Sequence, residues 1–117
     1  MIPNAKVLPD IKRNLGVVDS NTVFDDIIVT GINGALAILN QLDCAPDNVA
    51  IDGETTWDKI IPSKYNSIFP AIKQFIMLRT KLIFDPPTSQ TLAQAINFEI
   101  SQLEWRINNY TDIEKAR

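Results

Sequence analysis

Sixteen consecutive residues, from Ile27 to Leu42, carry no charge, and this segment limits what the chain can fold into. It is shorter than the roughly 20 apolar residues that a helix needs to cross a bilayer. At 100° per residue its polar positions fall in one narrow sector and its apolar positions fill the remainder, which is typical of a helix packed on several sides. The pattern therefore predicts a central core helix over about residues 23–42.

The start of this helix and its two glycines allow further predictions. Thr22 with Asp25 three residues later is a capping-box-like start, and Asp25 and Asp26 would lie at the positive end of the helix. Gly31 and Gly34 fall in its apolar sector, where each costs about 1 kcal/mol relative to alanine. We expect the close approach of another backbone to compensate for them.

Three other segments have helical patterns. A short helix is predicted over residues 9–15, with Gly16 at its left-handed exit. A third helix covers residues 69–84, and a fourth starts at Thr88 or Ser89 and runs to about Tyr110. The apolar stripe of the fourth helix recurs every three or four residues and comprises Leu92, Ile96, Ile100, Leu103, Ile107 and Tyr110.

The break between the last two helices is a structural turn made of Phe84, Asp85, Pro86 and Pro87. Proline lacks a backbone donor and disfavours helix in the preceding residue, so the third helix must stop there. Because the break is short, the last two helices are predicted to be antiparallel neighbours. We expect the turn to set the angle between them.

Residues 43–67 form the long connection of the chain. Within it the runs Val49–Ile51 and Thr55–Trp57 flank Asp52-Gly53, which predicts a tight β-hairpin. The fold expected is all-α: one domain over residues 1–117, built as a small bundle of about four helices. The last two helices form an antiparallel hairpin, and the long irregular connection carries the candidate β-hairpin.

Composition excludes several kinds of chemistry. The chain has no histidine, so the usual titrating side chain and zinc ligand are missing. Its single cysteine, Cys44, cannot form an internal disulfide, and without a histidine to activate it we expect a structural role. A net charge of −3 argues against a domain that binds by neutralising phosphates. We predict no catalytic residue, no cofactor and no metal.

Two aromatic residues lie outside the apolar stripe of the fourth helix. Phe98 and Trp105 are seven residues apart, so they share a face that is nearly opposite the stripe. A helix with two apolar faces has two neighbours. Either this face packs against the first or second helix of the same domain, or it is buried against another copy of the protein. Met77, on an otherwise polar face of the third helix, is a weaker sign of the same kind.

Arg79 interrupts the apolar sector of the third helix. Either its stem lies along apolar surface with the guanidinium at the edge, or a buried guanidinium pairs with a carboxylate of this chain or a neighbour. The sequence does not identify that carboxylate, although Glu99 is one option.

Several motifs together resemble the tailed-phage head–tail connector (adaptor) family. In that family an apolar helix ends in a Phe-Asp-Pro-Pro turn, and the next helix carries a Leu-Glu-Trp-Arg-Leu-like ending. The N-terminal half, with Asp25-Asp26 opening a long apolar helix, is similar to the usual beginning of the family. The most specific residues of the resemblance are Phe84-Asp85-Pro86-Pro87-Thr88-Ser89 and Glu104-Trp105-Arg106.

The resemblance implies a structural virion protein with no enzymatic activity. Its copies would form a homo-oligomeric ring, typically of twelve, in the neck beneath the portal protein. The ring would be assembled in the host cytoplasm, would extend the DNA channel without sequence-specific binding, and would dock a tail-completion or stopper protein. No membrane is involved. The residues we expect at subunit or partner interfaces are Phe98, Trp105, Arg79, Arg106, Met77, Val49, Ile51 and Trp57.

Two other hypotheses belong to different classes. A small helical regulatory or DNA-binding module would need a recognition helix with clustered base-contacting side chains, and no such cluster is seen. A hydrolase that used carboxylates alone would rely on Asp25 and Asp26, whose positions helix-start electrostatics already explains.

Overall fold

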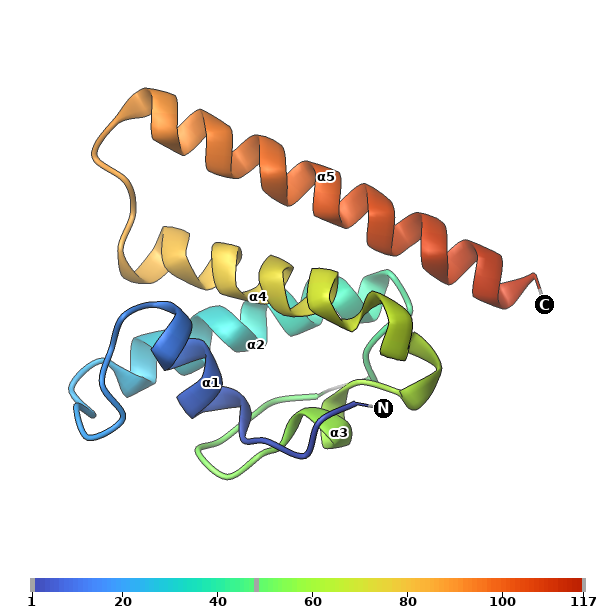
Figure 1. The fold of residues 1–117 in the computed structure, drawn as a ribbon, viewed down its shortest axis with the longest axis horizontal. Helices are drawn as coiled ribbons and strands as arrows, with labels where there is room; N and C mark the ends of the chain where they lie inside the picture. Colours follow the sequence, from blue (N-terminus) through green and yellow to red (C-terminus); the bar gives the residue numbers. More distant parts are fainter. Residues whose placement is uncertain (1, 48, 117) are drawn as a thin grey trace.

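Helices form the architecture of this chain, whose residues 2–47 and 49–116 are described by a computed structural model (Figure 1). Within those residues there are five α-helices, one 3-10 helix and no β-strand, so the all-α prediction is confirmed. In chain order the elements are α1 (Val7–Asn14), α2 (Asp25–Gln41), α3 (Trp57–Ile60), η1 (Ser63–Ile68), α4 (Phe69–Phe84) and α5 (Gln90–Lys115).

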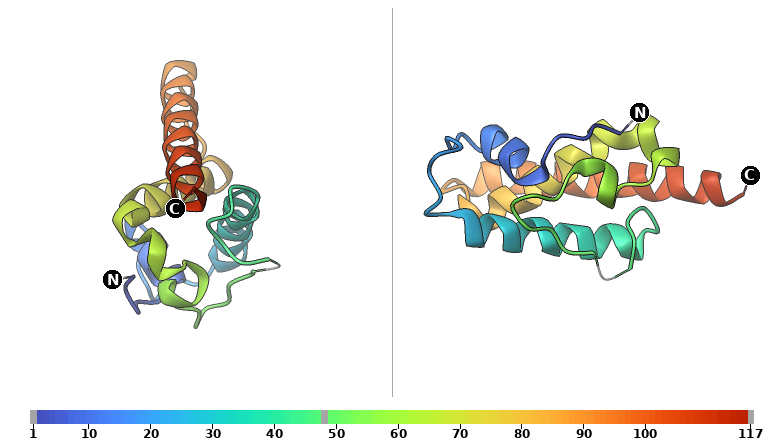
Figure 2. Two further views of the ribbon diagram at one scale, coloured as in Figure 1. Left: turned by 90° about the vertical axis from the view of Figure 1, so that its right-hand side faces the viewer. Right: turned by 90° about the horizontal axis from the view of Figure 1, so that it is seen from below.

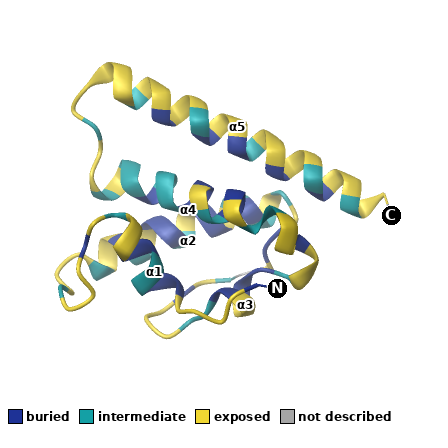
Figure 3. Ribbon diagram, viewed as in Figure 1, coloured by how far each residue is buried: buried dark blue, intermediate teal, exposed yellow. Residues whose placement is uncertain are grey.

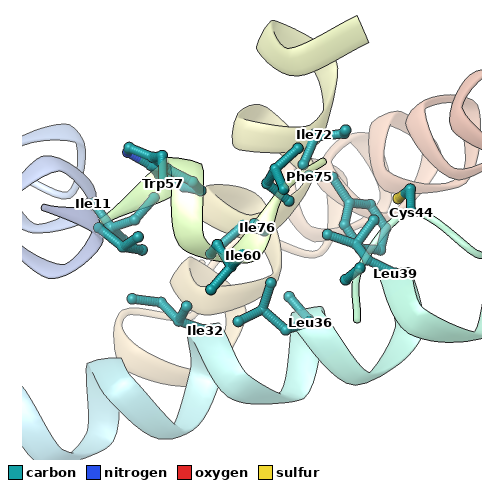
Figure 4. Packing of buried hydrophobic residues seen from close by; sticks show 14 of the residues in the cluster. Ile11, Ile32, Leu36, Leu39, Cys44, Trp57, Ile60, Ile72, Phe75 and Ile76 are labelled. Atoms are coloured by element: carbon teal, nitrogen blue, oxygen red, sulfur yellow. The ribbon is translucent and has the colours of Figure 1, made fainter. Parts of the chain in front are cut away.

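The helices lie in three layers. Figures 1 and 2 show α2 and α4 side by side in the middle, α5 on one side of them, and α1 with α3 on the other. The molecule measures 43 × 35 × 22 Å. The core gathers side chains from the middle layer and from α1 and α3, all at most 2% exposed (Figure 4): Ile11, Ile32, Leu36, Leu39, Trp57, Ile60, Ile72, Phe75 and Ile76.

The distance between α2 and α4 is set where Gly31 meets Thr80. A Cβ placed on Gly31 would lie 3.0 Å from Thr80 Cγ2 and 3.1 Å from Thr80 Cα. The Thr80 hydroxyl donates to the carbonyl of Ile76 at 2.8 Å, so this buried polar group is satisfied within its own helix. The expected close approach is confirmed for Gly31 but wrong for Gly34, whose Cβ would meet nothing within 4 Å.

A buried lysine joins α1 to the start of α2. Lys12 Nζ donates to the carbonyl oxygens of Asp19 and Asn21 at 3.1 and 2.8 Å and lies 2.9 Å from Asp25 Oδ1. The predicted side-chain cap by Thr22 is wrong, because the cap residue of α2 is Phe24 and it makes no side-chain cap bond. The two aspartates do lie in the first turn, as expected. Asp25 therefore neutralises an internal cation as well as the helix end.

The predicted β-hairpin at Asp52-Gly53 is wrong. Ile51 N donates to Asn33 Oδ1 on α2 at 2.8 Å, whereas Trp57 N donates to the carbonyl of Ala5 at 3.0 Å. The two short runs thus find partners in distant segments rather than in each other. The Asp52 carboxylate accepts from the backbone of Glu54 at 2.8 Å and closes a turn, and these hydrogen bonds hold its pKa below the usual value. The 43–67 connection is also less irregular than expected, since it contains α3 and η1.

The Asp10 carboxylate on α1 bonds to side chains of two other helices, α3 and α4. Its carboxylate Oδ2 accepts from the indole Nε1 of Trp57 at 2.9 Å and lies 2.8 Å from Lys73 Nζ. The Trp57 ring is fully buried and meets the Phe69 ring edge-on, with the ring centroids 5.2 Å apart. One carboxylate therefore satisfies the buried indole N–H and anchors both α1 and α4 to α3.

The last two helices form the predicted hairpin. Helix α4 ends at Phe84, and the Ser89 hydroxyl accepts from Leu92 N at 3.3 Å to cap α5. Helix α5 runs five residues beyond the expected end at Tyr110. The Tyr110 hydroxyl is 2.7 Å from Ser67 Oγ, and Lys115 pairs with Asp43, so the C-terminal half of α5 is fastened to the preceding connection.

The two glycines of α2 give a matched test of the close approach. We expect Gly31→Ala to lower the free energy of unfolding by about 1–3 kcal/mol, because the added methyl group must displace Thr80. Gly34→Ala should raise it by about 1 kcal/mol through helix propensity alone. Urea unfolding followed by circular dichroism measures both. Equal effects of the two substitutions would contradict the proposed role of Gly31.

Lys12 and Arg13 provide a second matched pair. Lys12→Met should destabilise the fold by about 2–3 kcal/mol, because two carbonyl oxygens and the Asp25 carboxylate lose their internal cation. Arg13→Met removes only an exposed pair with Asp19 at 3.4 Å and should cost less than about 0.5 kcal/mol. The same urea titration tests this, and a Lys12→Met protein as stable as the parent would contradict it.

Candidate interaction surface on the last helix

Helix α5 buries one side against the body of the protein. Four residues of the predicted stripe, Ile96, Ile100, Leu103 and Ile107, are at most 8% exposed. At the ends of the stripe, Leu92 is 50% exposed and Tyr110 is half-buried. The stripe is thus confirmed in its middle, and the first turn of α5 is left without a full cover.

The opposite side of α5 carries two exposed aromatic side chains. Phe98 and Trp105 are each 65% exposed. The expectation that they pack on the first or second helix of the same chain is therefore wrong. Burial against another copy, the alternative, stays a prediction. Figure 3 shows that the side of α5 away from α4 is exposed along its length.

This side of α5 is poor in charge. Among the exposed residues from Gln90 to Asn109, one carries a charged side chain, Arg106, and the glutamates Glu99 and Glu104 are half-buried. Exposed Trp, Phe and Arg side chains are typical of the centre of a protein interface. Arg106 lies about 100° around the helix axis from Trp105, at the edge of the side that carries the two aromatic rings. We call Phe98, Trp105 and Arg106 the α5 outer face.

A second exposed apolar surface lies where α2 begins and α4 ends. Val23 is 81% exposed, Phe24 42%, Ile27 41% and Ile83 48%. The Phe24 ring meets the Phe84 ring edge-on, with the centroids 5.1 Å apart, so the two helix ends are in contact here. We call Val23, Phe24, Asp26, Ile27 and Ile83 the α2 end patch.

Sequence reasoning missed the α2 end patch. Helical periodicity groups Phe24 and Ile27 with the apolar sector of the central helix, and Ile83 with the apolar sector of the third helix. Such grouping predicts burial for all three. It could not show that α5 diverges from α4 at this end and leaves them uncovered (Figure 1).

The other residues expected at interfaces are distributed differently. Arg79 is half-buried with its guanidinium carbon 5.9 Å from the Phe75 ring centroid, and within 2–47 and 49–116 no carboxylate pairs with it. This agrees with a stem lying on apolar surface. Met77 and Val49 are half-buried, whereas Ile51 and Trp57 belong to the core. Burial removes the last two from the free surface of the folded chain.

The buried cysteine is expected to be unreactive. Cys44 is fully buried, and burial, aided by the charge of Asp43, raises the pKa of its thiol to about 12. Among the residues that the structure describes, no group of three acidic or thiol side chains is arranged to hold a metal ion. None of the described helices combines the length and the apolar character that a bilayer crossing requires.

Comparison with known families identifies one relationship. The family model described as Phage connector protein matches residues 7–114, from the first residue of α1 to the end of α5. The match includes both the α5 outer face and the α2 end patch. It confirms the resemblance stated from the sequence. Neither the curated proteins nor the solved structures contain a match to this chain.

The state of Cys44 can be measured directly. At pH 8 a thiol with the ordinary pKa of 9.0 is about one-tenth ionised, whereas a pKa of about 12 leaves about one thiolate in ten thousand. We expect alkylation by iodoacetamide at pH 8 to be about a thousandfold slower in the native protein than in urea. Mass spectrometry follows the reaction, and rapid labelling of the native chain would contradict the burial.

Proposed function

This chain belongs to the phage connector protein family, and from that premise we propose that its copies assemble into a ring that joins the virion head to its tail. A structural connector role is common to the family. The ring itself, its placement beneath the portal protein and the docking of a tail-completion or stopper protein are parts of our proposal.

The α5 outer face carries this proposal. Two large aromatic side chains stay exposed on a helix whose opposite side is buried against the body of the protein. Covering such a side chain stabilises a complex by about 1.5–3 kcal/mol relative to leaving it in water. A ring supplies a neighbour to every subunit, so each copy can cover the aromatic pair of the next.

A structural rather than enzymatic role agrees with the lack of side chains suited to catalysis. The chain has no histidine, and its one cysteine is held in the protonated, buried form. At the start of α2, Asp25 pairs with Lys12, and both Asp25 and Asp26 lie in the first turn, where acidic side chains stabilise a helix. We therefore assign no catalytic residue and no cofactor.

The charge of the chain suits a channel for DNA. Each copy has a net charge of −3, and a ring of about twelve copies, the number usual in this family, multiplies that charge. Like charge disfavours sticking of the genome during its passage. We propose that DNA moves through the ring without sequence-specific contact, and that the ring is assembled in the host cytoplasm and ends in the virion neck.

The location of the protein tests the proposal. Purified virions should contain the chain in the copy number of a ring, and imaging of the neck should place it between portal and tail. A protein that is absent from virions and stays monomeric at high concentration would overturn the proposal. Steep, salt-dependent binding to duplex DNA would instead favour a DNA-binding module.

Substitution of Trp105 separates assembly from folding. Because its side chain is 65% exposed, Trp105→Ala should leave the melting temperature of the monomer unchanged. It should weaken self-association at least about tenfold, as expected for an aromatic interface anchor. Sedimentation and thermal melting are measured on the same samples.

Asn97→Ala is the matched control, since Asn97 is an exposed residue of the same helix that lies about 100° around the helix axis from Phe98. It should change neither quantity. Equal loss of stability and assembly in Trp105→Ala would mean that the indole side chain of Trp105 packs within its own protomer.

A further inference from the structure

The two exposed apolar surfaces of the chain belong to different elements and face different directions. The α5 outer face lies on the side of α5 away from α4, whereas the α2 end patch lies where α2 starts and α4 stops (Figures 1 and 3). Resting on the proposed function, we infer that the α5 outer face of one copy docks on the α2 end patch of the next. In this contact Arg106 faces Asp26.

The apolar parts of the two surfaces complement each other. The α5 outer face offers two protruding rings, Phe98 and Trp105, and the α2 end patch offers side chains that are 41–81% exposed: Val23, Phe24, Ile27 and Ile83. Aromatic anchors on one side and mainly aliphatic side chains on the other are what an interface core requires. Joining the two surfaces removes both from water at once.

The charges of the two surfaces are also complementary. Around the α2 end patch, Asp25 pairs with Lys12 and Asp85 with Lys81. The side chain of Asp26 is exposed, and in the described part of the chain it has no ion-pair partner; the same is true of Arg106 on α5. Each surface thus presents one uncompensated charge, and the two charges have opposite sign.

The same charges argue against a symmetric contact between two α5 outer faces. An antiparallel contact of two α5 helices centred on Trp105 would bring two Arg106 guanidinium groups near each other, and the glutamates of that segment, Glu99 and Glu104, are half-buried. Docking of α5 on the α2 end patch avoids this repulsion.

A contact between two different surfaces is heterologous. Each copy then uses its α5 outer face toward one neighbour and its α2 end patch toward the other. Such a contact propagates from copy to copy and yields a closed ring when the rotation between neighbours closes. The inferred contact therefore supplies the repeating interface that the proposed ring needs.

Engineered cysteines provide a direct test, because the native thiol is buried and should not react. We would introduce Asp26→Cys and Arg106→Cys, separately and together, and treat the concentrated protein with a short bis-maleimide. The double variant should give a ladder of covalent oligomers. A mixture of the two single variants should stop at dimers, and neither single variant should cross-link alone.

The pair Glu54→Cys and Arg106→Cys is the matched control. Glu54 is highly exposed, pairs with Lys6 and belongs to neither surface, so this pair should give no ladder. Dimers of the single Arg106→Cys variant would reveal a symmetric α5 contact and overturn the inference. An equal ladder from the control pair would overturn it as well, because it would show random collision.

Charge reversal tests the same contact without cysteines. Asp26→Arg and Arg106→Asp should each weaken self-association about tenfold or more, and the double reversal should restore it to within about threefold of the parent. Arg106 is exposed, so Arg106→Asp should leave the melting temperature unchanged, whereas Asp26→Arg replaces a favourable charge in the first turn of α2 and should lower the melting temperature only slightly. If neither single reversal affects association, or if the double reversal restores nothing, the inference is wrong.

The parent protein separates failure of this inference from failure of the proposed function. If the parent assembles but the cysteine pair does not cross-link, the ring stands and the inferred contact is wrong. If the parent does not associate at any concentration and is absent from virions, the proposed function and the inference both fail.

Discussion

The close approach of α2 and α4 at Gly31 and Thr80 is the constraint on which the rest of the structure depends. With no side chain on Gly31, the methyl group of Thr80 can lie directly against the backbone of α2. The helices are then near enough for Phe24 to meet Phe84 at one end and for the isoleucines and leucines of the core to interdigitate further along. Every other element packs on this pair, with α5 on one side and α1 and α3 on the other (Figure 2).

Polar groups inside the fold act as fasteners between layers. Lys12 holds the α1–α2 linker and the start of α2 through three oxygen atoms, and Asp10 joins α1, α3 and α4 through Trp57 and Lys73. Lys12 is almost fully buried and Asp10 is mostly buried. An unpaired charge inside a protein is costly, so each of the two groups has several polar partners. Helix α5 packs along the body of the protein through Ile96, Ile100, Leu103 and Ile107, and Tyr110 and Lys115 bond its C-terminal part to the connection before α4.

This arrangement has a direct consequence for assembly. The chain presents two separate apolar surfaces, and neither is covered within it. In the ring that we propose, a contact between the two surfaces would combine apolar burial, which supplies affinity, with one pair of opposite charges, which sets the register.

Local pattern was enough to predict the all-α class, the limits of α4, a cap at Thr88 or Ser89 and the stripe of α5, because each depends on neighbours within a few residues. It also identified Phe98 and Trp105 as a second apolar face. The family was identified from the resemblance of sequence motifs. Only the tertiary structure showed that Thr55–Trp57 contacts the N-terminal segment instead of forming a hairpin, that Ile51 and Trp57 are core residues, and that the α2 end patch is open. These outcomes depend on which distant segments meet, and periodicity describes the face of a helix but not the partner that covers it.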